Sequence, residues 1–316
     1  ESLNRAKWFQ LFIFTMIISL SYPVKSQQLF SFDHDGLNRQ YYLHIPDSLM
    51  LGAPLVFVFH GYGGSAISIM DYSNMNSTAD ENMFVVCYPQ GTLDDYGNAF
   101  WNVGYEFHSN ETVDDIGFIR GLSEQLEVQY QLSKYNIFGT GMSNGGDLSY
   151  MLACNASERF QAVAPVAGTM MTHLFLNCQP EQPMSVFEIH GTDDDVTLWE
   201  GDHDNSEGWG SYLDIPSIID FWIEINQCES TSMDTLDNND ENDESYIISE
   251  RSYDCINDNE VKLFKIMGGG HDWPGSYGNM DIHSNQEIWK FFDQNIQEEV
   301  VGDVNFDLSL DILDIL

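Results

Sequence analysis

Apolar runs alternate with segments of helical periodicity through most of the chain. Several continuous apolar runs are bounded by glycine or proline, which predicts strands buried on both faces, as in a parallel sheet covered by helices. These runs are 54–61, 83–91, 135–141, 160–168, 184–191 and 261–270. An alternating pattern over 29–46 predicts one further strand at the start.

Helical segments lie between these runs. Apolar residues at helical spacing predict a helix over 114–130, and the acids at its start suit the helix dipole. A second helix is predicted over 284–292, with Ser284 and Glu287 spaced as a capping box. The alternation indicates βαβ units, so we expect an α/β domain with a doubly wound, mainly parallel sheet and helices on both faces.

Segment 229–259 breaks this rhythm. Its centre reads DTLDNNDENDES, which is polar and acidic and predicts a solvated surface loop inserted into the domain. Cys228 and Cys255 flank the insertion, and a disulfide between them would join its two ends.

The first residues predict a secretory signal at 1–26, followed by the folded domain at 27–300. Arg5 and Lys7 precede an apolar run that is short for a membrane span, and Ser26 is a suitable last residue before cleavage. An uncleaved anchor is the alternative. Because the chain begins with Glu1 rather than Met, we expect the natural start upstream. The prediction is a secreted or periplasmic protein without stable membrane association after signal cleavage.

Charge and cysteines refine this prediction. With 11 Lys and Arg against 50 Asp and Glu, the net charge is −39, which disfavours nucleic acid and anionic membranes as partners.

An exported protein usually pairs its cysteines, and the five cysteines of this chain leave one unpaired. Cys87 lies in a predicted buried strand and is our candidate for the unpaired thiol. The chain has no C-x-x-C spacing that would suggest zinc.

Ser143 lies in the motif Gly141-x-Ser143-x-Gly145, between a predicted strand and a predicted helix. This is the spacing of a nucleophile elbow, in which the serine backbone is strained and the two glycines avoid clashes. The hydroxyl then stands above the sheet, and the amide of Asn144 faces the position of an oxyanion. A plain strand–helix turn is the alternative for this motif alone.

Partners for this serine follow later strands in the order serine, acid, histidine, as nucleophile-elbow enzymes require. His271 follows the strand over 261–270 and is the predicted base, whereas His60 and His190 lie in His-Gly turns and are expected to shape the backbone. Three acids follow the strand over 184–191: Asp193, Asp194 and Asp195. The glycine-rich loop after 54–61 predicts a second oxyanion donor, the amide of Tyr62, whose side chain would line the acyl pocket.

The last residues, 301–316, form a separate segment with the oxygen spacing of a calcium loop. Loop positions one, three, five, seven, nine and twelve are Asp303, Asn305, Asp307, Ser309, Asp311 and Asp314. Leu308 takes position six, where glycine is preferred. The segment resembles the first half of a dockerin repeat, which implies Ca²⁺ binding and a cohesin-like partner for an intact parent.

Eight motifs occur in a fixed order between residues 28 and 297: HGYGG, YPQG, FWN, DDIGFIRGL, GMSNGGDLSYMLAC, FQAVAPVAG, HGTDDDV and GGGHDWPG. Together they resemble the secreted polyhydroxybutyrate depolymerase and feruloyl esterase group of α/β-hydrolases, which includes enzymes similar to carbohydrate esterase family 1 and the LpqC-like esterases. The resemblance implies the α/β-hydrolase fold, Ser143 as nucleophile and His271 as base.

The same resemblance bears on the acid and on the cysteines. The family motif His-Gly-Thr-x-Asp places the acid on Asp194. The family's later prolines are replaced here by Asp195 and Leu198, so Asp193 and Asp195 stay open as alternatives. The family also implies a disulfide between Cys154 and Cys178.

These residues predict acyl transfer from an ester in two steps, with no metal or organic cofactor. Trp101 and Trp273 are our candidates to line the acyl groove, with a core role as the alternative. The expected substrates are hydroxycinnamoyl esters on polysaccharide, which the dockerin-like tail favours, or hydroxyalkanoate polyesters. A non-catalytic binding module is disfavoured by the complete Ser, Asp and His set. A serine peptidase of the prolyl-oligopeptidase type is disfavoured because no propeller-length segment precedes the domain.

Overall fold

The computed structural model describes residues 28–297. The predicted signal at 1–26 and the predicted calcium loop within 301–316 lie outside the described residues. Within 28–297, every helix is too short or too polar to cross a lipid bilayer.

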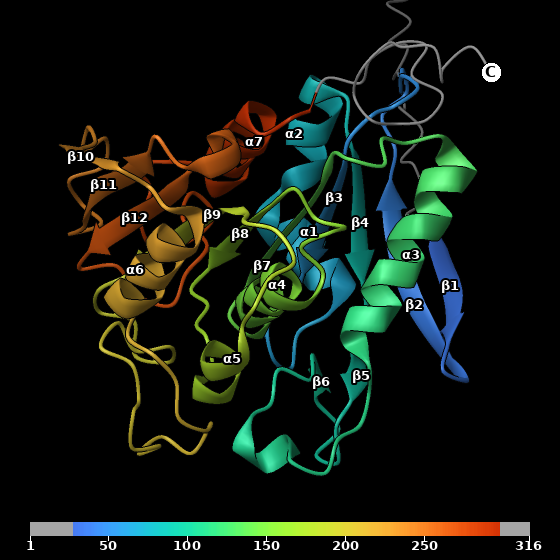
Figure 1. Ribbon diagram of the computed structural model, residues 1–316, viewed down its shortest axis with the longest axis horizontal. Helices are drawn as coiled ribbons and strands as arrows, with labels where there is room; N and C mark the ends of the chain where they lie inside the picture. The colour runs from blue at the N-terminus through green and yellow to red at the C-terminus, as the bar shows by residue number, and fades with distance from the viewer. Residues whose placement is uncertain (1–27, 298–316) are drawn as a thin grey trace, which may run out of the picture.

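One mixed sheet runs through the described part of the chain, with the strand order β1-β2-β4-β3-β7-β8-β9-β12-β11-β10 (Figure 1). Its central strands are parallel, and four of them are buried along their whole length, which confirms the predicted doubly wound, mainly parallel sheet. These central strands are β3 (Leu55–Phe59), β4 (Val85–Pro89), β7 (Ile137–Met142), β8 (Ala162–Val166), β9 (Ser185–Gly191) and β12 (Val261–Met267).

The N-terminal end of the sheet differs from the prediction of a single strand over 29–46. The structure has an antiparallel hairpin of β1 (Leu29–His34) and β2 (Leu37–His44). Asp35 and Gly36 form its two-residue turn with φ of 49° and 79°. An Asp-Gly pair is the usual sequence signal for such a turn, and the alternation on either side conceals it.

The other end of the sheet corrects the prediction of a solvated loop over 229–259. The structure has two antiparallel strands there, β10 (Ser230–Thr235) and β11 (Tyr246–Tyr253), which extend the sheet beyond β12. Only the acidic stretch 236–245 is a connection. Composition misled the prediction because main-chain pairing with β12 supports strands whose side chains are mostly polar.

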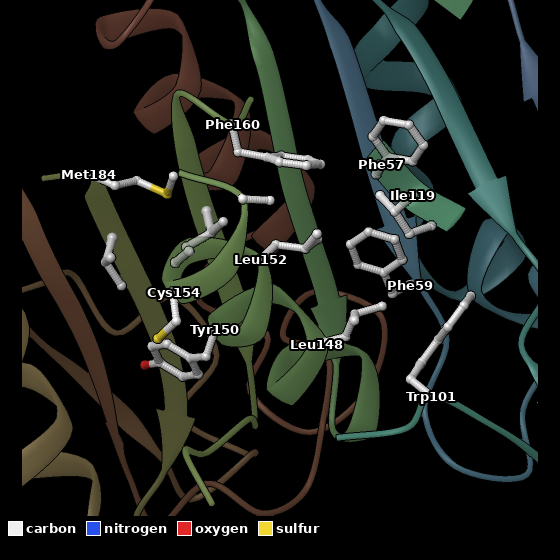
Figure 2. Packing of buried hydrophobic residues seen from close by; sticks show 14 of the residues in the cluster. Phe57, Phe59, Trp101, Ile119, Leu148, Tyr150, Leu152, Cys154, Phe160 and Met184 are labelled. Atoms are coloured by element: carbon white, nitrogen blue, oxygen red, sulfur yellow. The ribbon is translucent and has the colours of Figure 1, made fainter. Parts of the chain in front are cut away.

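Helices cover both faces of the sheet. One layer contains α3 (Asp115–Tyr130), α4 (Asn144–Asn155) and α6 (Ile215–Asn226), and the opposite layer contains α1 (Ala66–Ser73), α2 (Met75–Asn82) and α7 (Ser284–Gln294). Figure 2 shows part of the first layer, where Phe59 of the sheet packs near Leu148 of α4. The short elements are β5 (Thr92–Leu93), β6 (Ala99–Phe100), α5 (Thr172–Asn177) and two 3₁₀ turns, Glu106–His108 and Ile256–Asp258.

The two predicted helices form, and their starts differ. Helix α3 begins after Asp114, whose carboxylate accepts a hydrogen bond from the Gly117 amide. The predicted capping box of α7 is wrong, because the N-cap residue is His283 and the Ser284 hydroxyl is buried without a partner. Glu287 instead pairs with Lys290 one turn later.

The cysteines pair as the sequence predicts. Disulfides join Cys154 to Cys178 and Cys228 to Cys255, and Cys87 is a free, buried thiol. The second bridge joins the start of β10 to the end of β11, so it closes the base of the extra hairpin.

Candidate active site

The predicted nucleophile, acid and base follow three parallel strands of the sheet. Ser143 directly follows β7, Asp194 follows β9, and His271 follows β12. Strands β7, β8, β9 and β12 are consecutive neighbours in the sheet and run in one direction. Their carboxyl ends meet at one edge, where loops after separate strands gather side chains into one site.

Ser143 occupies a strained turn between β7 and α4. Its backbone has φ 56° and ψ −123°, and φ above zero is rare for a residue with a Cβ. A Cβ on Gly141 would lie 2.6 Å from the carbonyl oxygen of Gly145, and a Cβ on Gly145 would overlap the main chain of Phe59. Both glycines are therefore required by close backbone approach, as the elbow motif predicts.

His271 and Asp194 form a hydrogen-bonded pair. The distance between His271 Nδ1 and Asp194 Oδ2 is 2.8 Å. The other carboxylate oxygen of Asp194 accepts from the amides of Val196 and Thr197, at 2.9 and 2.8 Å. Asp194 is buried, whereas its two acidic neighbours in the chain are exposed, so the structure pairs His271 with the middle acid of the three.

Ser143 and His271 share no hydrogen bond among the described residues. The side chain of His271 is 18% exposed. Contacts between a nucleophile and its base are often longer in a resting enzyme and tighten when substrate is bound. This edge of the sheet thus carries an oriented imidazole and a half-buried serine that lines a pocket, an arrangement that can support nucleophilic catalysis.

Two main-chain amides flank the serine. Gly61 lies against it, since a Cβ on Gly61 would be 3.9 Å from Ser143 Oγ, and the amide of Tyr62 follows directly. The amide of Asn144 begins α4. Neither the Tyr62 amide nor the Asn144 amide donates a hydrogen bond to any group within residues 28–297. Two free amides beside a serine suit an oxyanion.

The side chain of Asn144 makes two hydrogen bonds to the main chain of Trp101. Its Oδ1 accepts from the amide of Trp101 at 2.8 Å, and its Nδ2 donates to the carbonyl of the same residue at 3.0 Å. Asn144 therefore fixes the segment after β6 to the start of α4, and this role was not predicted.

A small, partly open pocket lies beside Ser143. Its walls are mainly aromatic and apolar, with one carboxyl group among them. The lining residues are Tyr105, Ser143, Asp147, Thr169, Met171, Val196, Thr197, Trp209 and Tyr212. A pocket with apolar walls and few polar groups is the usual form of a small-molecule site.

The carboxyl group in this pocket, Asp147, was missed by sequence reasoning. It lies one turn after Ser143 on α4, where an acid suits the helix dipole and needs no further explanation. The hydroxyl of Tyr105 and the amide of Thr169 donate to it, each at 2.7 Å. Burial raises the pKa of Asp147 to about 7, so the charge of the pocket changes near neutral pH.

Three predicted substrate contacts lie elsewhere. Trp101 and Trp273 are fully buried, so the prediction that they line the groove is wrong and the core alternative is correct. Trp101 donates its indole N–H to the carbonyl of His60, at the start of the glycine-rich loop after β3. The Tyr62 ring packs against Trp209 and its hydroxyl bonds to Asp94, so Tyr62 supports the pocket wall rather than lining it.

Comparisons with known proteins give consistent likenesses. The model of the prolyl oligopeptidase family matches residues 70–184. The bifunctional acetylxylan esterase/xylanase XynS20E of Neocallimastix patriciarum is 24% identical over 82% of this chain and 34% of its own length. A probable feruloyl esterase C of Aspergillus niger is 30% identical over 53% of this chain and 59% of its own. The chain thus spans between a third and three fifths of these relatives.

Solved structures agree on the architecture. An acetyl xylan esterase from Aspergillus awamori superposes with a TM-score of 0.58, at 14% identity, over 84% of this chain and 99% of its own. The chain described by residues 28–297 therefore has the α/β-hydrolase fold. A fluorophosphonate-binding serine hydrolase of Staphylococcus aureus shares that fold with a TM-score of 0.51, at 12% identity, over 86% of this chain and 99% of its own. The α/β-hydrolase fold predicted from the motifs is confirmed.

Proposed function

We propose that this α/β-hydrolase is a serine carboxylic ester hydrolase, with Ser143 as nucleophile, His271 as general base and Asp194 as the orienting acid. The observation that carries the proposal is the strained elbow at Ser143, which lies at the same sheet edge as the hydrogen-bonded pair of His271 and Asp194. A merely structural turn does not require a serine that lines a pocket in a costly backbone conformation.

The proposed reaction has two steps. His271 takes the proton of Ser143 as the hydroxyl attacks the ester carbonyl, and the amides of Tyr62 and Asn144 hold the negative oxygen. His271 then returns the proton to the leaving alcohol. In the second step His271 activates water, which releases the acid and restores Ser143. Asp194 keeps the imidazole in one tautomer through the bond at Nδ1 and stabilises its cation.

The proposed substrate is a hydroxycinnamoyl ester carried by a polysaccharide. The proposal is supported by the aromatic residues Tyr105, Trp209 and Tyr212 in the pocket wall, since aromatic rings attract one another by edge and face contacts. Relatives of this chain are named feruloyl esterases and an acetylxylan esterase. Two disulfides support export to an oxidising compartment.

A second candidate is peptide hydrolysis. It is favoured by the match to the prolyl oligopeptidase family, which includes the elbow but ends before Asp194 and His271. The sequence relatives reported above are named as an acetylxylan esterase/xylanase and a feruloyl esterase, so polyester hydrolysis enters only as a comparison in the test.

The test compares substrates on the full chain expressed in an oxidising compartment. The panel is methyl ferulate, an acetylated xylo-oligosaccharide, a hydroxybutyrate trimer and a prolyl peptide. We expect the highest kcat/KM on methyl ferulate. Ser143→Ala should lower kcat at least about 10⁴-fold, whereas Ser77→Ala, at an exposed position on α2, should leave it unchanged. Peptide hydrolysis above ester hydrolysis, or an active Ser143→Ala variant, contradicts the proposal.

A further inference from the structure

A second imidazole lies directly behind the acid of the proposed site. His190 is on β9, four residues before Asp194, and both side chains are completely buried. The distance between His190 Nε2 and Asp194 Oδ2 is 3.5 Å. The same oxygen of Asp194 accepts the hydrogen bond from His271, so this oxygen lies between two imidazole rings.

The partners of His190 determine how many protons it carries. Nε2 lies 2.8 Å from the carbonyl oxygen of Thr197, and a carbonyl can only accept, so Nε2 carries a hydrogen. Nδ1 lies 2.9 Å from Glu188 Oε1 on the same strand. Both ring nitrogens therefore face acceptors. This pattern suits an imidazolium, because the neutral ring has one nitrogen that must accept.

Burial raises the pKa of Glu188, and hydrogen bonds to its carboxylate oppose that shift. Its Oε2 accepts from the hydroxyl of Tyr150, at 2.8 Å, and the amide of Gly168 also donates to this carboxylate. Burial keeps the pKa of Tyr150 well above its usual value, so its hydroxyl remains a donor. Hydrogen bonds to a carboxylate stabilise the charged form. Glu188 Oε1 and His190 Nδ1 therefore share one proton across their 2.9 Å contact.

Other titratable groups near the pair of Glu188 and His190 are Lys265, Asp147 and Tyr212. Lys265 of β12 is the register neighbour of His190, and its ammonium lies over the Trp199 ring, 4.6 Å from the centroid. Asp147 on α4 acts on Glu188 from a distance. The Tyr212 hydroxyl accepts from the Leu198 amide. Burial lowers the pKa of His190, but the contact with Glu188 and the charges of Glu188 and Asp194 outweigh it and raise that pKa.

We propose that His190 is a positioning residue for the reaction: Glu188 holds it as a buried imidazolium, which balances the charge of Asp194 and sets the pH at which His271 becomes protonated. This inference rests on the proposed serine hydrolase function. Asp194 is shielded from water, and a buried carboxylate needs a compensating charge. His190, whose Nε2 lies 3.5 Å from Asp194 Oδ2, supplies that charge.

The direction of the effect follows from the signs of the charges. Asp194 attracts a proton to His271, and the cation of His190 opposes that attraction. When His190 is neutralised, His271 takes up its proton at a higher pH, and the free base is lost sooner as the solution is acidified. If Glu188 takes up a proton in response, it compensates most of the lost cation, so the shift keeps its direction but becomes smaller. The expected shift is about half to one pH unit.

The first experiment measures kcat/KM against pH for His190→Gln. Glutamine can still donate to the Thr197 carbonyl but carries no charge. We expect the acid limb of the profile to move to higher pH by about half to one unit. The matched control is His60→Gln, another buried histidine of a His-Gly turn, whose acid limb should coincide with that of the unaltered protein. An acid limb of His190→Gln that stays in place or moves to lower pH overturns the proposal, since a purely structural role lowers activity without moving the limb.

A second experiment uses the unaltered protein with ¹⁵N-labelled histidine and needs neither activity nor a stable variant. At pH 8 we expect one histidine, His190, with both ring nitrogens protonated. If every histidine has one bare nitrogen at that pH, the proposal is wrong. Loss of Ser143-dependent hydrolysis would refute the proposed function instead, and the nitrogen spectrum would still report on His190.

Discussion

Two His-Gly pairs end two parallel strands of the sheet, and their imidazoles have opposite surroundings. His60 follows β3 and His190 lies near the end of β9, each about 1% exposed. His60 Nε2 accepts from the amide of Gly91 at 3.0 Å, and Nδ1 donates to the carbonyl of Gly61 at 2.8 Å. Burial lowers the pKa of His60 to about 4. Both ring nitrogens of His190, in contrast, face hydrogen-bond acceptors.

The difference shows that the dipeptide does not decide the charge of its histidine. The donor to His60 comes from the end of β4, the neighbouring strand of the sheet. The acceptors of His190 come from its own strand and from the loop that carries Asp194. The first turn thus holds the neutral ring of His60 at the start of the loop after β3. The second turn holds the proposed cation of His190 next to Asp194.

The glycines of the two pairs differ as well, and their substitution has the largest expected effect. A Cβ on Gly191 would overlap the carbonyl of Gly269, in the loop that leads to His271, whereas a Cβ on Gly61 would meet Met142 at an ordinary 3.4 Å. Gly191→Ala should displace that loop and lower the free energy of unfolding by about 4 kcal/mol, with loss of most activity.

Gly61→Ala is the matched control for this prediction. It should change the free energy of unfolding by less than about 1 kcal/mol. Urea denaturation of both variants measures the difference. Equal stability of the two would show that the loop before His271 adapts to a side chain at Gly191.

The neutral state of His60 predicts a dependence of stability on pH. Because its pKa is lowered in the fold, the unfolded chain binds more protons, so this contribution is complete above about pH 6.5 and is lost as the pH falls to about 4. The full loss is up to about 3 kcal/mol. His60→Gln should remove this slope, as measured by urea denaturation at several pH values.

The control for His60 is His203→Gln, because the His203 side chain is 60% exposed. It should leave the slope of the unaltered protein in place. A His60→Gln variant with the same slope as the unaltered protein would mean that His60 is charged in the fold.

The smallest expected effect on stability concerns Tyr62, the residue after Gly61. Burial alone would raise the pKa of Asp94, but hydrogen bonds from Tyr62, from His108 and from main-chain amides lower it to about 2. Tyr62→Phe removes one of these donors and should lower the free energy of unfolding by about 1 kcal/mol at neutral pH. The loss should shrink as the pH falls toward about 2, where the carboxylate is protonated in the fold, which thermal denaturation at pH 7 and pH 2 compares. A loss that does not depend on pH would assign the effect to ring packing against Trp209.

Local patterns predicted the elements that position the site. The buried strands, helix α3 and the elbow at Ser143 all carry their signals within a few residues. The hairpin at Asp35 also carries its signal, which the surrounding alternation conceals. The strands β10 and β11 could not be read from composition, because their stability comes from pairing with β12.

The buried polar groups are the part that sequence reasoning missed. Asp147, Glu188 and His190 belong to elements whose neighbours are far away in the chain, and each is held by a donor or acceptor from another element. For Trp101 and Trp273 the error has the opposite direction. Sequence motifs predicted that they line the site, but both are buried in the core.

The chain by itself determined that a strained serine follows one strand, that acids and a histidine follow two later strands, and that the cysteines can pair. These features depend on backbone preferences and on the order of elements, which are local. Only the tertiary structure decided which of three acids holds His271, which histidine is charged, and what lines the pocket. Those outcomes depend on burial and on donors that approach from distant elements, because proton affinity inside a protein is set by the groups within a few ångströms of it.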